Sequence, residues 1–132
     1  MALPITVFIV DDDESSQRAM SRLMRAAHFQ PVCANSVKEL MAKQLPSHEA
    51  VIIADVTATR QYAETLPKQL HESGRSLPVI YLTDCDTEHT RKEARRVGAA
   101  GYFRKPVDEQ ALVDAITFAV RHSTAELSVS EI

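Results

Sequence analysis

The chain has 132 residues, 45% of them hydrophobic and 25% charged, with a formal net charge of -3. These values are typical of one globular domain with its own core, and the acidic balance argues against direct nucleic-acid binding by this domain. Two cysteines are too few for a disulfide framework or a zinc site, which favours a reducing, cytoplasmic setting. No apolar run approaches the ~20 residues of a membrane span and no signal peptide is recognisable, so we expect no membrane contact.

The first half of the chain alternates short apolar runs with helical patterns. The runs Ile5–Val10 and Ala50–Asp55 are rich in β-branched residues and predict strands, the second of them buried on both faces. Between them, apolar residues at helical spacing predict a helix over about 16–28, followed by a short strand over Pro31–Ala34. A capping-box pattern then opens a second helix over about 36–44.

The second half continues this alternation after residues 56–64, which lack periodicity and are expected to form a loop. The expected elements are a helix over about 67–72, a strand over Leu77–Thr83, a helix over about 87–97, a strand over Ala100–Arg104 and a helix over about 108–121. Residues 1–122 are therefore expected to form the domain, and residues 123–132 a frayed tail or the start of a linker.

Five repeats of strand and helix predict an α/β fold. Such alternation favours parallel strands joined by right-handed crossovers, with helices on both faces of one sheet. We expect a flavodoxin-like three-layer α/β/α sandwich, a five-stranded parallel sheet in the order 2-1-3-4-5 and five helices. In that order, ligands bind beyond the carboxyl ends of strands one and three.

Polar residues stand at four of the five expected strand ends. Strand one is followed by Asp11 and Asp12, strand three ends at Asp55, strand four at Thr83, and Lys105 follows strand five. Three neighbouring carboxylates stay ionised only when a cation offsets their repulsion, and oxygen ligands suit Mg²⁺. A metal, a carboxylate nucleophile, an ammonium group and a hydroxyl together suit phosphoryl transfer to an aspartate.

Four stretches in this order resemble the receiver domain of two-component response regulators, over about Thr6 to Arg121. They are VFIVDD at Val7–Asp12, VIIAD at Val51–Asp55, PVIYLT at Pro78–Thr83 and GAAGYFRKP at Gly98–Pro106. Each piece alone is a weak signal, but four in the right order at strand ends are specific. The Lys-Pro dipeptide after the fifth strand is the sharpest of them.

The resemblance implies a phosphoacceptor with a metal site. Asp55 matches the phosphorylated aspartate and Asp12 a direct ligand of Mg²⁺ (or Mn²⁺). Asp11 matches an acid that acts on the metal largely through water, and Thr57 the position whose backbone carbonyl binds it.

The resemblance also implies a switch. Thr83 and Lys105 match the pair that grips the phosphoryl oxygens, and Tyr102 the aromatic residue that turns inward when Thr83 moves. Pro106 matches a structural proline usually preceded by a cis bond, and Cys85 a position that tunes access of water to the acyl phosphate.

The implied activity is acceptance of a phosphoryl group from a histidine kinase or phosphotransfer protein, so the domain is expected to be a switch and not a turnover enzyme. The responding surface would be the fourth helix, the fifth strand and the fifth helix, around Arg91, Arg95, Tyr102 and Arg104. This surface would act on an output protein or on an output domain outside this chain, or mediate dimerisation. The sequence leaves open whether the chain is a single-domain regulator or part of a longer protein.

Two features depart from the family pattern. The residues after Asp55 lack the usual Met-Pro or Leu-Pro and the later glycine, which puts the contribution of Thr57 in doubt. Asp84 follows Thr83 where a small residue is usual, and its carboxylate would crowd and repel an incoming phosphoryl group. We therefore hypothesise that phosphorylation of Asp55 is slow or has been partly lost.

Other interpretations stay open. The same fold could act as a binding or scaffold module without phosphorylation. A phosphatase with an aspartyl intermediate is disfavoured, because such enzymes carry a second acid two residues after the nucleophile, where this chain has Thr57. The acids at 11–14 could form only a solvated helix start, Tyr102 could be a half-buried strand residue, and the basic residues at 91–96 could be a solvated helix face.

Overall fold

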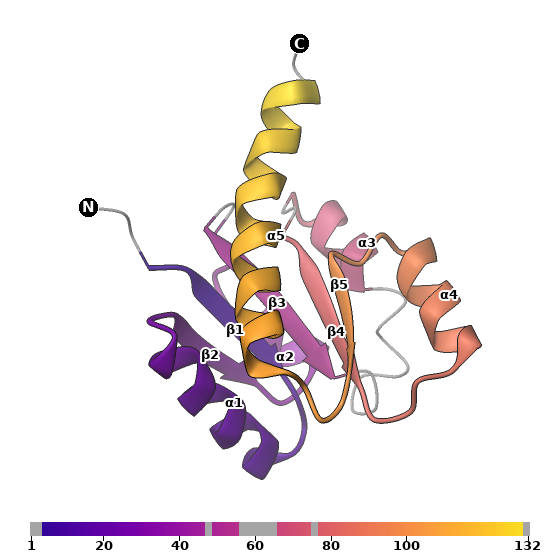
Figure 1. The fold of residues 1–132 in the computed structure, drawn as a ribbon. Coiled ribbons are helices and arrows are strands. Elements are labelled where there is room, and N and C mark those ends of the chain that lie inside the picture. Colours follow the sequence, from indigo (N-terminus) through magenta and orange to yellow (C-terminus); the bar gives the residue numbers. More distant parts are fainter. Residues whose placement is uncertain (1–3, 47–48, 56–65, 75–76, 131–132) are drawn as a thin grey trace.

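A computed structural model describes residues 4–46, 49–55, 66–74 and 77–130 (Figure 1). In chain order its elements are β1 (Thr6–Val10), α1 (Glu14–Ala26), β2 (Gln30–Ala34), α2 (Val37–Met41), β3 (Ala50–Asp55), α3 (Leu66–Glu72), β4 (Val79–Thr83), α4 (Glu88–Arg96), β5 (Gly101–Arg104) and α5 (Glu109–Ser130). All four strand pairings are parallel, and the sheet has the order β2-β1-β3-β4-β5. The predicted α/β class and strand order are confirmed.

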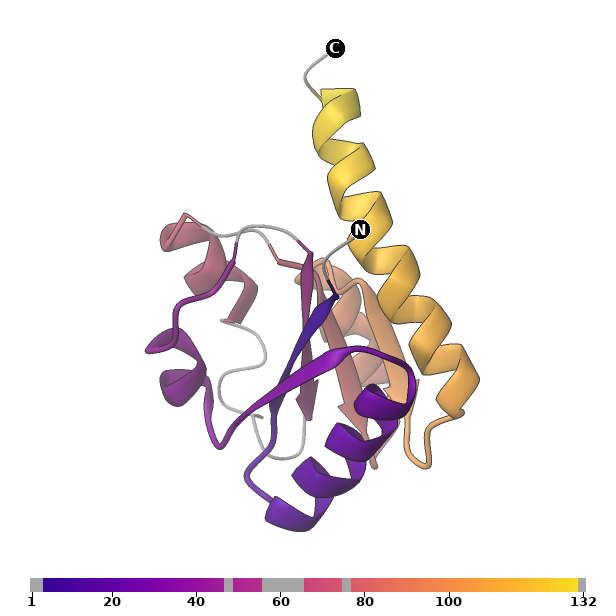
Figure 2. The same ribbon diagram turned by 90° about the vertical axis from the view of Figure 1, so that its left-hand side faces the viewer.

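Alternation along β3 divides the core into two halves. All six residues of β3 are buried. Ile52 and Ala54 pack in the half that includes buried side chains of α2, α3 and α4, whereas Val51 and Ile53 pack in the half that includes those of α1 and α5. Figures 1 and 2 show the corresponding three layers, with α1 and α5 on one face of the sheet and α2, α3 and α4 on the other. Burying each of the valine and isoleucine side chains contributes roughly 1.5–3 kcal/mol before chain entropy is counted.

The register of the sheet brings the strand ends together. Val10 of β1 is paired with Ala54 of β3, so the acids that follow these two residues begin at the same level. Asp55 is paired with Leu82 of β4, and the next residue of β4 is paired with Arg104 of β5. The carboxyl ends of β1, β3, β4 and β5 therefore meet at one edge of the sheet.

Helix α1 begins two residues earlier than predicted. Asp13 is its N-cap, and its carboxylate accepts hydrogen bonds from the Ser15 backbone N–H at 3.3 Å and from the Ser16 hydroxyl at 2.8 Å. This acid satisfies the orphan donors that open the helix, so the helix starts at Glu14. The helix-start interpretation of the acids at 11–14 thus applies to Asp13 and Glu14.

The capping box predicted for α2 is half formed. The Ser36 hydroxyl accepts from the Glu39 backbone N–H at 3.1 Å, but the Glu39 carboxylate accepts from the Asn35 N–H at 2.9 Å. The helix ends at Met41, earlier than the predicted position 44.

Helix α5 is longer than predicted, since it continues to Ser130 where an end near residue 121 was expected. Residues 122–130 contain no glycine or proline that would stop a helix. The end of α5 projects beyond the sheet in Figures 1 and 2. The assignment of residues 123–132 to a tail or linker stays a prediction, although residues 123–130 are helical.

Membrane-spanning helices were also sought. Within the described residues, no helix combines the length and apolar character that crossing a membrane requires.

Candidate functional site

Two buried carboxylates lie at the carboxyl edge of the sheet. Asp11 is 7% exposed and Asp55 is 5% exposed. The Asp11 carboxylate accepts a hydrogen bond from the Asp13 backbone N–H at 2.9 Å. The backbone N–H of Asp11 donates to the Ala34 carbonyl at 3.1 Å. Burial raises the pKa of Asp11, and the charges of Asp55 and Asp12 raise it further, against the lowering effect of the bond from Asp13. This edge therefore carries an excess of negative charge that favours a cation.

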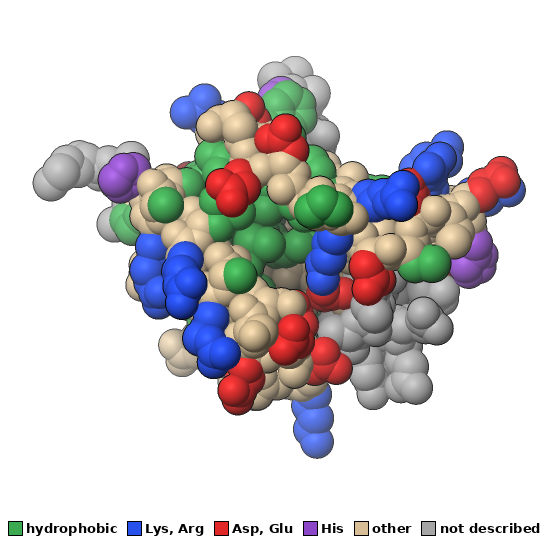
Figure 3. Space-filling model, turned by 60° about the horizontal axis from the view of Figure 1, so that its bottom comes forward, with side chains coloured by type: hydrophobic (Ala, Val, Ile, Leu, Met, Phe, Trp, Pro, Cys, Tyr) green, Lys and Arg blue, Asp and Glu red, His purple; other side chains and the backbone are tan. Residues whose placement is uncertain are grey.

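Lys105 supplies one such cation. Its ammonium group donates a hydrogen bond to Oδ2 of Asp55, and its side chain is only partly exposed. Burial lowers the pKa of Lys105, but the hydrogen bond to Asp55 and the charges of Asp55, Asp11 and Asp84 outweigh it, so the pKa is raised overall. Figure 3 looks onto this end of the molecule, where acidic and basic side chains lie close together.

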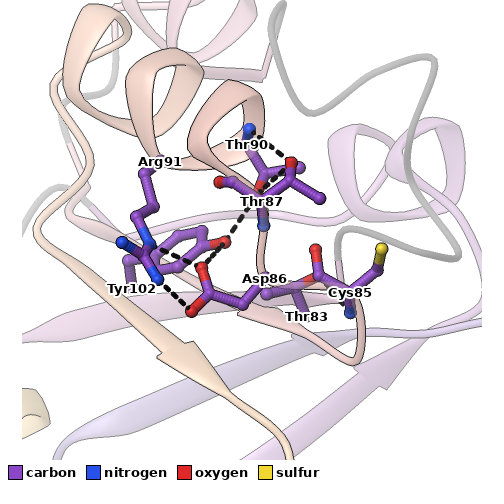
Figure 4. Close-up of polar contacts among 7 residues, drawn as sticks. All are labelled: Thr83, Cys85, Asp86, Thr87, Thr90, Arg91 and Tyr102. Carbon is purple, nitrogen blue, oxygen red and sulfur yellow. Dashed lines mark hydrogen bonds and ion pairs between the residues drawn. The ribbon is translucent and has the colours of Figure 1, made fainter.

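Thr83 ends β4 and is 1% exposed. Its hydroxyl accepts from the Cys85 backbone N–H at 3.0 Å and donates to the Cys85 carbonyl at 3.1 Å (Figure 4). In this conformation the Thr83 hydroxyl therefore donates its proton within the β4–α4 loop. Asp84 and Cys85 in that loop are exposed.

A second polar group lies beside this loop, at the N-terminal end of α4. The Tyr102 hydroxyl donates to Oδ1 of Asp86 at 3.0 Å and lies 2.6 Å from the Thr90 hydroxyl. Arg91 donates from Nε and Nη2 to the two oxygens of Asp86, each at 2.7 Å. We call Asp86, Thr90, Arg91 and Tyr102 the Asp86 network; Figure 4 shows it close to Thr83 and Cys85.

The charge state of this network is fixed by Arg91. Its guanidinium lowers the pKa of Asp86 to about 2, mainly through the hydrogen bonds, with Tyr102 adding to the effect. Burial raises the pKa of the Tyr102 phenol. Sequence reasoning singled out Tyr102 but missed Asp86 and Thr90. Asp86 directly precedes the helix cap Thr87 and lies five residues before Arg91, a spacing that gives only a weak signal.

The donor chemistry of this edge fits a hard divalent cation. Asp11 and Asp55 offer buried carboxylate oxygens, which suit Mg²⁺. Asp12 is exposed, and Thr57 lies outside the described residues. Among the residues that the structure describes, no three His, Cys, Asp or Glu side chains are grouped closely enough to hold a metal ion.

The structure thus brings four of the predicted site residues to one edge of the sheet: Asp11, Asp55, Thr83 and Lys105. The peptide bond before Pro106 is cis, in agreement with what the resemblance implies. Tyr102 is half-buried and lies in the neighbouring Asp86 network.

Known proteins are similar to this chain in sequence and architecture. The response regulator receiver domain family matches residues 7–117. Response regulator protein TodT of Pseudomonas putida is 27% identical over 115 residues, which cover 87% of this chain and 51% of TodT. The chain spans about half the length of curated relatives such as TodT.

Solved structures of receiver proteins are also similar to this chain. A response regulator receiver protein from Burkholderia phymatum is 30% identical, with 83% of this chain and 89% of that chain covered and a TM-score of 0.62. A receiver protein from Pseudoalteromonas atlantica superposes with a TM-score of 0.77 over 89% of this chain and 98% of that chain, at 22% identity.

Proposed function

The chain belongs to the family of response regulator receiver domains, and from this premise we propose that Asp55 accepts a phosphoryl group from a histidine kinase or phosphotransfer protein. The observation that carries the proposal is the buried Asp55 paired with Lys105 beside a second buried acid, Asp11. We expect this exchange to occur in the cytoplasm, and we expect the domain to switch without turning over a substrate.

In the proposed reaction, a carboxylate oxygen of Asp55 attacks the phosphorus of a phosphohistidine in line with the leaving imidazole. The new P–O bond forms as the P–N bond breaks, and the imidazole nitrogen takes the electron pair. Lys105 then shifts from Asp55 to a phosphoryl oxygen, where its charge offsets the charge that develops there. Thr83 donates its hydroxyl proton to another phosphoryl oxygen, which requires that it give up the Cys85 carbonyl.

Asp11, Asp12, Asp55 and the carbonyl of Thr57 would hold Mg²⁺ (or Mn²⁺). When bound, this ion would neutralise charge between the carboxylates and the transferred group. Asp12 would have to turn inward, because its side chain is exposed in this conformation.

We further propose that the reaction is slow. The charge of Asp84 acts on Lys105 and adds to the upward shift of the Lys105 pKa. A carboxylate that competes for Lys105 weakens its grip on a phosphoryl oxygen and repels the incoming anion. Cys85 and Thr57 would tune access together with Asp84; Thr57 lies outside the described residues.

The output surface is proposed to be α4–β5–α5. Arg91, Ala94, Arg95, Ala99, Gly101 and Tyr102 line an open pocket of about 230 Å³ on it. Basic side chains on α4 would favour an acidic partner segment or a second copy of the domain. Because the chain spans about half of relatives such as TodT, an output domain outside this chain is an equally suitable target.

A phosphorylation-independent binding module is the alternative. It is favoured by Asp84, whose carboxylate follows Thr83 and would repel an incoming phosphoryl group, and by the departure from the family pattern after Asp55. Mg²⁺ titration separates the two functions. The phosphoacceptor requires binding that Asp12→Ala weakens about tenfold or more, whereas the binding module requires none.

The direct test of the phosphoacceptor is incubation with acetyl phosphate and Mg²⁺, followed by intact-mass measurement. We expect one phosphoryl group on the wild type and none on Asp55→Asn. The matched control is Asp86→Asn, which removes a carboxylate outside the site and should still be phosphorylated.

A further inference from the structure

Two members of the Asp86 network, Asp86 and Thr90, are not among the residues to which the family resemblance gives a role. The central carboxylate of the network is 14% exposed and accepts three hydrogen bonds, one from Tyr102 and two from Arg91. A bidentate guanidinium with a third donor fixes an aspartate more firmly than one surface ion pair does. Asp86 therefore ties β5, through Tyr102, to the first turns of α4, through Arg91.

The opposite end of the same short segment is fixed by Thr83. The Thr83 hydroxyl accepts from Cys85 N–H and donates to the Cys85 carbonyl, one residue before Asp86. Residues 83–86 are thus held at both ends, by a hydroxyl at one and a carboxylate at the other (Figure 4).

The hydrogen bonds of Thr83 to Cys85 and those of Asp86 cannot both persist when the Thr83 hydroxyl binds a phosphoryl group on Asp55. A hydroxyl has one proton, so donating it to a phosphoryl oxygen ends its donation to the Cys85 carbonyl. The β4–α4 loop, in which Asp84 and Cys85 are exposed, must then adjust, and the change falls on the residue next to Asp86. Hydrogen bonds at 2.7 Å to both carboxylate oxygens tolerate little displacement, since they weaken steeply with distance and angle.

We propose that Asp86 is a latch that holds Tyr102 and Arg91 against the N-terminal end of α4, and that it opens when Thr83 turns from Cys85 to a phosphoryl group on Asp55. The inference rests on the proposed phosphoacceptor function. It adds a residue, Asp86, that acts through position and not through contact with the reacting atoms. In the resting domain the latch opposes the active arrangement.

By linkage, a contact made only in the resting state weakens binding of any ligand that selects the other state. Breaking the latch should therefore strengthen binding of a phosphoryl mimic at Asp55. The network is partly exposed, so the expected gain in affinity is about three- to fivefold.

The test uses the full ¹⁵N-labelled chain, Mg²⁺ and beryllofluoride as the phosphoryl mimic. The Nε–Hε signal of Arg91 in heteronuclear NMR reports the bond to Asp86, and calorimetry gives the affinity for the mimic. The test variants are Asp86→Ala and Arg91→Gln. The controls are Glu88→Gln and Lys92→Gln, which break the exposed Glu88–Lys92 pair on the same helix, 3.5 Å apart.

We expect beryllofluoride to move the wild-type Arg91 signal to its position in Asp86→Ala. We also expect both test variants to bind the mimic about three- to fivefold more tightly and both controls to bind it like the wild type. Binding that leaves the Arg91 signal unchanged, or equal affinities in all variants, would overturn the latch and leave the phosphoacceptor function standing. Failure of the wild type and of Asp86→Ala to bind the mimic would overturn both.

Discussion

Two aspartates in this molecule are each neutralised by one basic side chain, with opposite consequences. Asp55 is buried and bonded by Lys105, and the neighbouring acid Asp11 has a raised pKa because of its own burial and the charge of Asp55. Asp86 lies near the surface, and Arg91 bonds both of its oxygens, so the pKa of Asp86 falls to about 2. The buried pair leaves residual charge that a metal or a phosphoryl group can satisfy, whereas the surface pair is complete.

Charge pairing thus serves two purposes in one fold. At the sheet edge, incomplete compensation keeps a nucleophile available in a low-dielectric position. At α4, complete compensation holds a tyrosine and a helix end in one arrangement. Substitutions at the two pairs should therefore affect different properties.

The largest expected effect is that of Lys105→Ala. Removing the ammonium leaves Asp55 and Asp11 buried without this cation, so we expect the free energy of unfolding to fall by about 1–3 kcal/mol at pH 7. Urea denaturation without Mg²⁺ measures this loss. Arg91→Ala is the matched variant at the surface pair and should lose less than about 1 kcal/mol. Equal losses at the two pairs would remove the distinction between them.

An intermediate effect is expected for Asp84→Ser. Two like charges about 4 Å apart interact by roughly 1 kcal/mol in water, so removing this carboxylate should speed phosphorylation by acetyl phosphate about fivefold. Initial rates by intact mass give the comparison, with Asp108→Ser as an exposed control of equal charge. An unchanged or slower rate in Asp84→Ser would show that Asp84 does not retard the reaction.

The smallest expected effect concerns pH. Because the pKa of Asp86 is lowered from 3.8 to about 2, its contribution to stability is present above about pH 4 and is lost as the pH falls through about 2. The groups that act on it are Arg91, Tyr102 and Arg104. Carbon-13 NMR titration of the Asp86 carboxyl checks the midpoint, which should rise toward 3.8 in Arg91→Gln. A wild-type midpoint near 4 would contradict the tight pairing.

The sheet was predictable because its strands are continuous apolar runs. The run at β3 reads as buried on both faces, its bounds agree with the structure, and the carboxylate that ends it then falls at the ligand edge. The same logic placed Asp11, Thr83 and Lys105 at that edge, because parallel strands bring their carboxyl ends together.

Other features depend on tertiary contacts that no spacing reveals. Asp86 and Tyr102 are 16 residues apart and meet only because the β4–α4 loop lies beside β5. The start of α1 was set by the side chain of Asp13, one of four successive acids that the sequence does not distinguish. The extension of α5 was not predicted, because a segment without glycine or proline permits a helix but does not require one.

The central claim is that the buried carboxylate of Asp55 accepts a phosphoryl group. Its most direct measurement is peptide mass spectrometry of the chain after prolonged incubation with acetyl phosphate and Mg²⁺. We expect one phosphoryl group, located on Asp55 and absent from Asp55→Asn. A wild-type chain that stays unmodified, or an equal mass gain in Asp55→Asn, would contradict it.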